Sequence, residues 1–162
     1  MRPLSRIASI FCWCFIAVPI NEHNVAAQQS RFIPVRYDTT RCNYCRMIFQ
    51  EKNFGGALET LNDSLLLFDA SECLAAFLIG KKISEDSVKR IWSVEYLSPH
   101  SLVNGTTAWY LRSDRIMSPM EANIAVFASR RQADSVRMKL GGEVLNWQSV
   151  VRLIRDRWFR KD

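Results

Sequence analysis

The same order of predicted elements occurs twice along the chain, and this internal repeat constrains the fold more than any other feature of the sequence. Phe68-Asp69-Ala70-Ser71 marks the end of a strand that runs into a helix, and Phe127-Ala128-Ser129 does the same in the second half. Each junction follows two strand-like segments and precedes another. We therefore expect an α+β protein in which two tandem ββαβ units share a core.

The first repeat is predicted from turn residues and from the spacing of apolar residues. Asn62-Asp63 is a turn signal between two strand-like segments, which favours a hairpin. Asp69 or Ser71 can cap a helix that Gly80 ends, because Asp and Ser are good N-caps and Gly is a common stop. The expected elements are an extended segment at 31–36, strands at 57–61 and 65–68, a helix from 69 or 71 to 80, and a strand at 91–97.

The second repeat has the same order and is followed by one more helix. Gly141-Gly142 ends the second repeat's own helix. The final helix is amphipathic, with one side formed by Val150, Val151, Ile154 and Trp158. The expected elements are strands at 106–111 and 123–127, a helix at 129–140, a strand at 143–145 and the amphipathic helix at 147–158. We divide the mature chain into a first unit at 28–100 and a second unit at 101–162.

The N-terminus has the layout of a secretory signal peptide. Arg2 and Arg6 precede an apolar run from Ile7 to Ile20, and Val25-Ala26-Ala27 supplies small residues for cleavage. The run is about 14 residues long, which is shorter than the roughly 20 residues that a transmembrane helix needs. We predict cleavage after Ala27 and a periplasmic or otherwise extracytoplasmic protein. The alternative is an uncleaved segment that anchors the chain at the membrane.

The predicted mature chain is basic. The full chain has a formal net charge of +6, and the signal peptide takes two arginines and one glutamate with it, which leaves +5. Much of this excess lies in the C-terminal stretch, at Arg152, Arg155, Arg157, Arg160 and Lys161. Such a run usually covers the solvated end of a helix. Its functional alternative is contact with an acidic partner or with anionic lipid, and nucleic acid is not an expected partner of an exported protein.

The cysteine count argues against a purely structural set of disulfides. Cys12 and Cys14 lie in the presumed signal, so that the mature chain keeps Cys42, Cys45 and Cys73. Three cysteines cannot all pair within one chain. At least one thiol is therefore free, bound to a metal or bonded to another chain.

The segment Cys42-Asn43-Tyr44-Cys45-Arg46-Met47 is the strongest candidate for a chemical site. A tight turn can direct both thiols of a CxxC motif toward one ion, and Met47 adds a thioether. Thiolates and thioethers are soft ligands that select Cu(I), zinc or iron–sulfur clusters, and the thioether shifts the preference toward Cu(I). The segment therefore predicts a Cu(I) site.

Further ligands can come from other parts of the chain. Met117 and Met120 flank a Ser-Pro dipeptide whose proline restricts the backbone, so that both thioethers lie on a defined turn. Cys73 falls in the first turn of its predicted helix, where the helix N-terminus lowers a thiol pKa. Methionine and cysteine are also common in cores, so each has a plain packing alternative. His100 is the one histidine of the predicted mature chain, and a lone histidine in a loop is usually ordinary surface.

Other functions of the CxxC motif can be tested against its neighbours. Attachment of c-type haem needs a histidine directly after the second cysteine, and Arg46 excludes it. A thioredoxin-like thiol oxidoreductase would have the motif at the start of a helix, whereas 47–49 looks extended. A structural zinc module remains open if Cys42, Cys45, Cys73 and His100 meet as a Cys₃His set. A disulfide between the two motif cysteines also remains open.

Catalysis is not expected. The sequence contains neither the GxSxG motif of hydrolases, nor the phosphate-binding GxxxxGK motif, nor the HExxH motif of metalloproteases.

Five segments occur along the chain in a characteristic order. They are Cys42-Asn43-Tyr44-Cys45-Arg46-Met47, Phe68-Asp69 followed by Cys73, Ala108-Trp109-Tyr110-Leu111, Met117-Ser118-Pro119-Met120 and Gly141-Gly142-Glu143-Val144-Leu145. Together they resemble the NosL-type family of exported accessory proteins, which are associated with copper delivery to nitrous-oxide reductase. The resemblance covers nearly all of the mature chain.

This resemblance implies a pair of ββαβ units and one Cu(I) ion per chain, which is handed to a partner enzyme without turnover. It implies that Cys42, Cys45 and Met47 are motif residues, and that Met120 belongs to the second motif with Met117 beside it. The expected mechanism is ligand exchange. Cys42 and Cys45 bind Cu(I) as thiolates, a thioether from Met47 or Met120 completes a low-coordinate site, and ligands of the partner replace them one by one.

The sequence departs from the family pattern in two respects. Many members are lipoproteins, whereas no lipobox precedes Cys12 or Cys14, so the resemblance does not support a lipid anchor. Arg46 stands where the family often has glycine, and its charge beside the thiols is expected to favour their ionised form.

Overall fold

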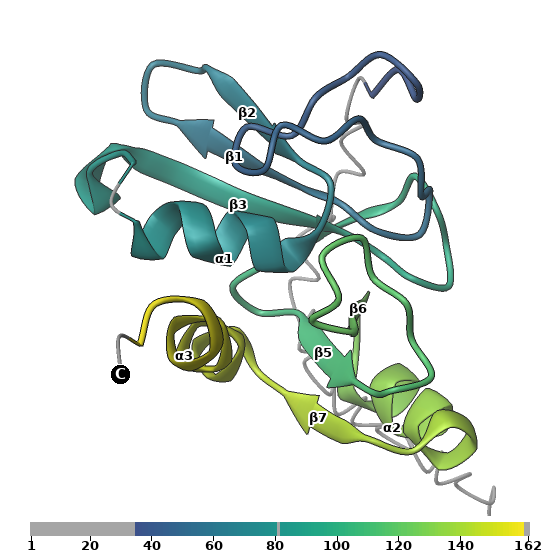
Figure 1. The fold of residues 1–162 in the computed structure, drawn as a ribbon. Helices are drawn as coiled ribbons and strands as arrows, with labels where there is room; N and C mark the ends of the chain where they lie inside the picture. The colour runs from purple at the N-terminus through teal and green to yellow at the C-terminus, as the bar shows by residue number, and fades with distance from the viewer. Residues whose placement is uncertain (1–34, 81, 161–162) are drawn as a thin grey trace, which may run out of the picture.

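The computed structural model describes residues 35–80 and 82–160, which form two antiparallel sheets and three α-helices (Figure 1). The predicted signal peptide, residues 31–34 of the expected extended segment, and Lys161 lie outside these residues. The elements are β1 (Gly56–Thr60), β2 (Leu65–Phe68), α1 (Ser71–Ile79), a 3₁₀ turn η1 (Glu85–Ser87), β3 (Val88–Val94), β4 (Leu102–Asn104), β5 (Trp109–Arg112), β6 (Ile124–Phe127), α2 (Arg130–Leu140), β7 (Glu143–Leu145) and α3 (Trp147–Trp158). The α+β class and the C-terminal helix are confirmed.

The two sheets share one strand order. The first sheet runs β2-β1-β3-β4 and the second runs β6-β5-β7, so that in each the opening strand of the repeat lies between the next two. The β1–β2 hairpin sets Gly56 opposite Phe68, as the Asn62-Asp63 turn predicts. The sequence does not predict β4, which pairs with the end of β3 and carries the first sheet past residue 100, where we place the end of the first unit.

Two strands have bounds other than those predicted, because a turn ends one of them and a side chain delays the start of the other. Strand β3 starts earlier and ends at Val94, since the chain then turns between Glu95 and Ser101, whose amide and carbonyl groups close that turn. Strand β5 starts later than residue 106. The Thr106 amide donates to Asn104 Oδ1 at 3.0 Å, which holds a turn there instead.

The second sheet is covered on both faces. Tyr110 of β5 and Val126 of β6 belong to the main core, whereas Leu111 and Phe127 belong to a second cluster with residues of α2. Successive residues of a strand point to opposite faces, so each strand supplies both clusters. The second sheet is therefore the middle layer between α2 and the main core.

Capping side chains start two of the helices. Ser129 Oγ accepts from the Gln132 amide at 3.3 Å, and Gln132 Oε1 accepts from the Ser129 amide at 3.0 Å, which is a capping box for α2. Asn146 Oδ1 accepts from the Ser149 amide at 2.9 Å at the start of α3.

At α1 the predicted side-chain cap is wrong. The N-cap is Ala70, whose side chain has no acceptor, so neither Asp69 nor Ser71 caps the helix. Gly80 ends α1 as predicted. Asp69 turns instead toward the cysteines described below.

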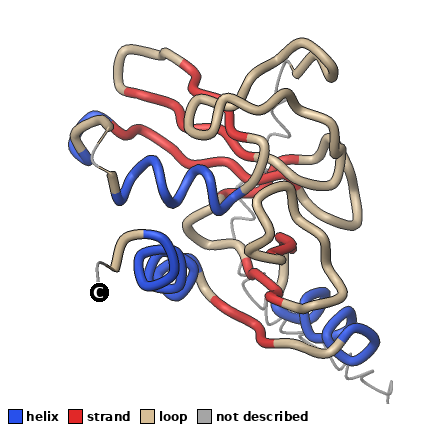
Figure 2. The backbone as a smooth tube through the Cα atoms, viewed as in Figure 1, coloured by secondary structure: helices blue, strands red, loops and turns tan. Residues whose placement is uncertain are grey.

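Helix α1 lies between the first sheet and α3 (Figures 1 and 2). Val150 and Ile154 of α3 are fully buried in the main core. The rings of Tyr110 on β5 and Trp147 on α3, with centroids 5.8 Å apart, join the last helix to the second sheet. Within the described part of the chain, no helix has the length and apolar character to cross a bilayer.

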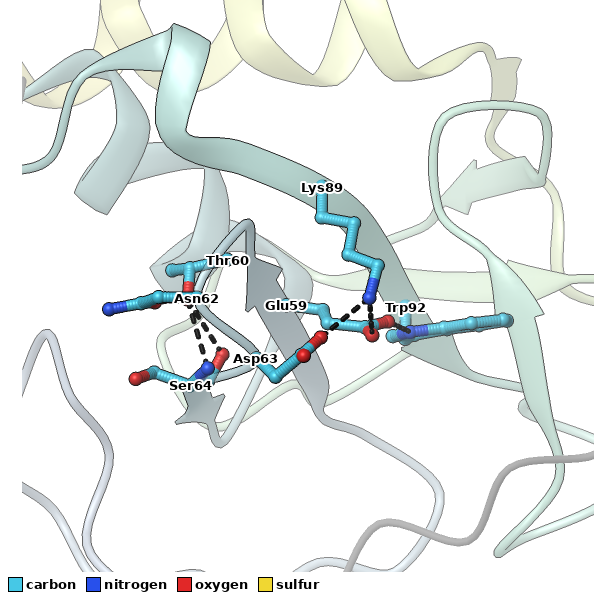
Figure 3. A network of polar contacts seen from close by, with 7 residues as sticks. All are labelled: Glu59, Thr60, Asn62, Asp63, Ser64, Lys89 and Trp92. Atoms are coloured by element: carbon cyan, nitrogen blue, oxygen red, sulfur yellow. Dashed lines mark hydrogen bonds and ion pairs between the residues drawn. The ribbon is translucent and has the colours of Figure 1, made fainter.

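A polar network closes the end of the β1–β2 hairpin (Figure 3). Lys89 of β3 forms ion pairs with Glu59 at 3.2 Å and with Asp63 at 2.6 Å. Trp92 Nε1 donates to Glu59 at 3.4 Å, so that this buried carboxylate has partners. The network fastens the hairpin turn to β3 and has a structural role.

The turn between α2 and β7 provides a test of the fold. A Cβ on Gly142, at φ 98°, would lie 2.0 Å from the Arg112 carbonyl oxygen, whereas a Cβ on Gly141, at φ 71°, would meet nothing within 4 Å. We expect Gly142→Ala to lower the free energy of unfolding by about 3 kcal/mol or more, because β7 must move off β5, and Gly141→Ala by about 1–2 kcal/mol from backbone strain alone. Urea unfolding followed by circular dichroism measures both, and equal losses would contradict the close approach.

Candidate metal centre

The segment Cys42–Met47 forms a tight turn closed by backbone hydrogen bonds. The Cys42 amide donates to the Met47 carbonyl at 2.9 Å, and the Arg46 amide donates to the Cys42 carbonyl at 3.1 Å. The residues that flank the turn pair as an isolated antiparallel bridge. Arg46 has a φ of 68°, a left-handed conformation that favours glycine. The turn that the CxxC spacing predicts is present.

Asn43 fastens this turn to the edge strand β2. Its backbone amide donates to the Leu67 carbonyl at 2.8 Å, and its side-chain Oδ1 accepts from the Leu67 backbone amide at 2.8 Å. One residue thus satisfies both backbone groups of Leu67 on the outer edge of the sheet. The Tyr44 ring stacks on Trp158 at the end of α3, with centroids 6.4 Å apart and planes 8° apart. The turn is therefore held between β2 and α3.

The third cysteine and an aspartate come from the junction between β2 and α1. Asp69 directly follows β2, and Cys73 lies in the first turn of α1. The sulfur atoms of Cys42, Cys45 and Cys73 and a carboxylate oxygen of Asp69 all lie within 4.8 Å of one another. All three thiols are free; Cys42 and Cys73 are fully buried and Cys45 is half-buried. Four donors of metal-binding type therefore surround one point.

The two buried thiols shift each other's pKa in opposite directions. The Cys73 thiol lowers the pKa of Cys42 to about 7 although burial acts in the opposite direction. The interaction with Cys42, together with burial, raises the pKa of Cys73. The lowered pKa expected at the start of α1 is therefore wrong for Cys73. At Cys42 the largest cause is the neighbouring thiol, and not the charge of Arg46 as expected.

Cys45 is held in its protonated form. Burial, and then the negative charge of Asp69, raise the pKa of Cys45 to about 12. Its thiol donates to Asp69 Oδ2 at 3.3 Å. Because thiol ligands bind metals as thiolates, a cation that enters this cluster must displace protons from it.

A cavity of about 210 Å³ adjoins Asp69 and joins the two predicted motifs. Its lining includes Met47 from the cysteine turn and Met117, Ser118 and Pro119 from the second motif. Met47 is 48% exposed and Met117 is 85% exposed. The two thioethers therefore lie on the walls of one solvent-accessible cavity beside the thiols.

Comparisons with known proteins identify the family and the fold. The model of the NosL family matches residues 35–153. The chain belongs to the NosL family. In the crystal structure of the copper chaperone NosL from Shewanella denitrificans, a chain matches this one with a TM-score of 0.62 and 20% sequence identity, covering 74% of this chain and 94% of that chain. The NosL fold is thus confirmed, and no curated protein matches the chain.

The remaining candidate residues occupy different places. Met120 is partly buried and packs against the main core, which includes Cys42 and Cys73, whereas Met117 lines the cavity. His100 is exposed, and its ring meets that of Tyr37 with centroids 6.2 Å apart, beside a different cavity. The Cys₃His zinc set is therefore not formed. Among the described residues, the group that joins the three thiols is Asp69.

Asp69 is the site residue that the sequence reasoning assigned to another task. It was expected to cap α1, so its position four residues before Cys73 was not used in the prediction of the site. Asp69 directly precedes the N-cap Ala70, so the chain holds it at the start of the helix that carries Cys73. Its place in the Phe68-Asp69 segment of the family pattern was the signal that could have revealed it.

Replacing Asp69 tests the electrostatics of Cys45. Asp69→Asn removes the negative charge beside the thiol, so the pKa of Cys45 should fall and its thiolate fraction at pH 8 should rise. We expect several-fold faster alkylation of Cys45 by iodoacetamide in the metal-free protein, measured by peptide mass mapping, since the thiolate is the reactive form. Asp86→Asn, at an exposed position on η1, should change nothing. An unchanged rate in Asp69→Asn would contradict the assignment.

Proposed function

We propose that this chain is an exported metallochaperone that binds one Cu(I) ion as cargo and passes it to a copper enzyme without turnover. The observation that carries the proposal is the group of three free thiols within 4.8 Å of one another and of Asp69, next to a cavity lined by two thioethers. Membership of the NosL family supports it, as does the name of the structural neighbour, a copper chaperone.

Cys42, Cys45 and Cys73 are the proposed thiolate ligands. Two of them are fully buried, where a soft monovalent cation can replace the protons and bind the sulfur atoms out of reach of water. Asp69 orients Cys45 through the hydrogen bond of 3.3 Å. The result is a closed, low-coordinate site in which sulfur supplies the strong bonds.

Met47 and Met117 are the proposed ligands for arrival and departure of the ion. Both are exposed in the cavity beside the thiols. Thioethers are neutral, so they bind Cu(I) more weakly than thiolates and do not exchange protons near neutral pH. Ligands of a partner can then replace them first and the thiolates afterwards. Met117 is proposed for this exposed role because it lines the cavity, whereas Met120 is partly buried against the core that contains Cys42 and Cys73.

A structural zinc site is the second candidate, and Asp69 is the observation that favours it. Zinc accepts a carboxylate beside three thiolates in a tetrahedral site. A zinc site would give the thioethers of Met47 and Met117 no role as ligands, whereas Cu(I) binds thioethers. A thiol oxidoreductase is less well supported, because Cys42 is fully buried and the motif lies in a turn that precedes no helix.

Location and acceptor are proposed from the sequence and the family. Residues 1–27 would direct export, and nitrous-oxide reductase would receive the copper. The last turns of α3 carry Arg152, Arg155 and Arg157, which suit an acidic surface of a partner or a peripheral contact with anionic lipid. Intact mass of the protein isolated from its host checks cleavage after Ala27.

Anaerobic titration with Cu(I) against a coloured chelator tests the binding. The protein from Gln28 onward should bind one ion per chain. Cys42→Ser, Cys45→Ser and Cys73→Ala should each weaken binding by more than about tenfold, because each removes a strong ligand. Met138→Leu is the control, since Met138 is 78% exposed and lies on α2. Stoichiometric zinc that resists Cu(I) would overturn the chaperone proposal, and full affinity in Cys73→Ala would leave that residue a packing role.

Copper transfer to metal-free nitrous-oxide reductase tests the acceptor. The Cu(I)-loaded chain should load the enzyme under anaerobic conditions, as followed by the enzyme's copper absorption bands. Met117→Leu should slow this transfer several-fold more than it weakens binding, because it removes a ligand exposed to the partner. Met138→Leu should transfer at the normal rate. No transfer from the unmodified chain would exclude this acceptor while leaving Cu(I) binding intact.

A further inference from the structure

Glu72 is a fully buried carboxyl group in the first turn of α1, next to Cys73 in sequence. It is not one of the four groups within 4.8 Å of one another that form the candidate metal centre. Burial raises the pKa of Glu72 to about 7, and burying such a group without a compensating partner is unfavourable. An apolar side chain would fill this position at lower free energy. The presence of a carboxyl group here therefore calls for an explanation.

The partner of Glu72 is the second motif. Ser118 Oγ donates a short hydrogen bond to Glu72 Oε1. The same Ser118 Oγ accepts from the Asn123 amide at 2.8 Å, and the Ser118 carbonyl accepts from the Glu121 amide at 3.0 Å. The backbone of Ala122 also interacts with the Glu72 carboxyl group and favours its charged form. Ser118 is therefore the junction at which the 117–123 loop is fastened to α1.

Ser118 directly follows Met117, whose thioether faces the cavity. Ser118 separates Met117 from Pro119, and all three residues line the cavity with Asp69 and Met47. The Met117 side chain is 85% exposed, so its own packing contacts do not fix its position. Its distance from the thiols therefore depends on where the Ser118 backbone is held.

We propose that Glu72 is a positioning residue which, through Ser118, holds the 117–120 segment against α1 and so keeps the Met117 thioether at the cysteine cluster. The inference rests on the proposed copper site for its purpose, but the fastening itself is a property of the metal-free protein. It links the second repeat, which carries Met117, to the first repeat, which carries all three thiols.

The metal-free protein provides the first test. Glu72→Leu and Ser118→Ala each remove one partner, and Glu72→Gln keeps an acceptor oxygen for Ser118 in nearly the same volume. We expect hydrogen exchange of the Glu121 and Asn123 amides, read by NMR, to become about tenfold faster in the first two variants, as for the loss of one buried hydrogen bond. Glu72→Gln should remain close to the unmodified protein. Glu59→Gln is the control, a second buried glutamate that lies on β1 away from this loop.

The Cu(I)-loaded protein provides the second test. X-ray absorption at the copper edge distinguishes long thioether from short thiolate sulfur bonds. Glu72→Leu and Ser118→Ala should lose the same thioether contribution as Met117→Leu, and Glu72→Gln should retain it. A role in packing alone would leave this spectrum unchanged.

The outcomes separate the two proposals. Unchanged exchange of Glu121 and Asn123 in Glu72→Leu would overturn the positioning role whatever metal is bound, because that variant leaves the Ser118 acceptor of the Asn123 amide in place. Failure of the unmodified chain to bind Cu(I), with fast loop exchange in Glu72→Leu and rescue in Glu72→Gln, would overturn the copper function and support the fastening.

Discussion

The paired hydrogen bonds between Asn43 and Leu67 are the interaction on which the rest of the site depends. They attach the cysteine turn to β2 at a point just before that strand ends. The chain then continues into Asp69 and the first turn of α1, so a turn fixed at Leu67 also lies beside Cys73. Residues far apart in sequence meet here because one strand edge positions one motif and its end positions the other. Attachment through backbone groups leaves every sulfur atom available.

Burial arranges the sulfur atoms in a sequence from the inside outward. Cys42 and Cys73 are fully buried, Cys45 is half-buried, and Met47 and Met117 are exposed. The same order separates groups that must lose a proton to bind a metal from groups that never carry one. In the proposed site, protons and a soft cation therefore compete in the interior, whereas the thioethers at the surface face no such competition. The strongest of the proposed ligands are those with the least contact with solvent.

The sequence predicts well what depends on neighbouring residues. The hairpin around Asn62-Asp63, the helix that begins near Ser129 and the amphipathic α3 follow from turn chemistry and apolar spacing, which are local properties. Strand β4 and the start of β5 do not follow, because the Asn104 side chain competes for a backbone amide. The same holds for the site. Spacing alone brings Cys42 and Cys45 together, whereas the position of Asp69 beside them and the exposure of Met117 depend on long-range packing that a motif does not encode.

The stack of Tyr44 on Trp158 has a consequence for how this chain matures. Tyr44 lies between the two motif cysteines, near the beginning of the described domain, and Trp158 is the last residue of its final helix. A ribosome makes Tyr44 early and Trp158 late in the synthesis of the chain. The cysteine turn gains its outer wall only when the last helix has docked. Until then the thiols of the turn are less shielded from oxidants. Docking of α3 therefore completes the protection of cysteines that were made early in synthesis.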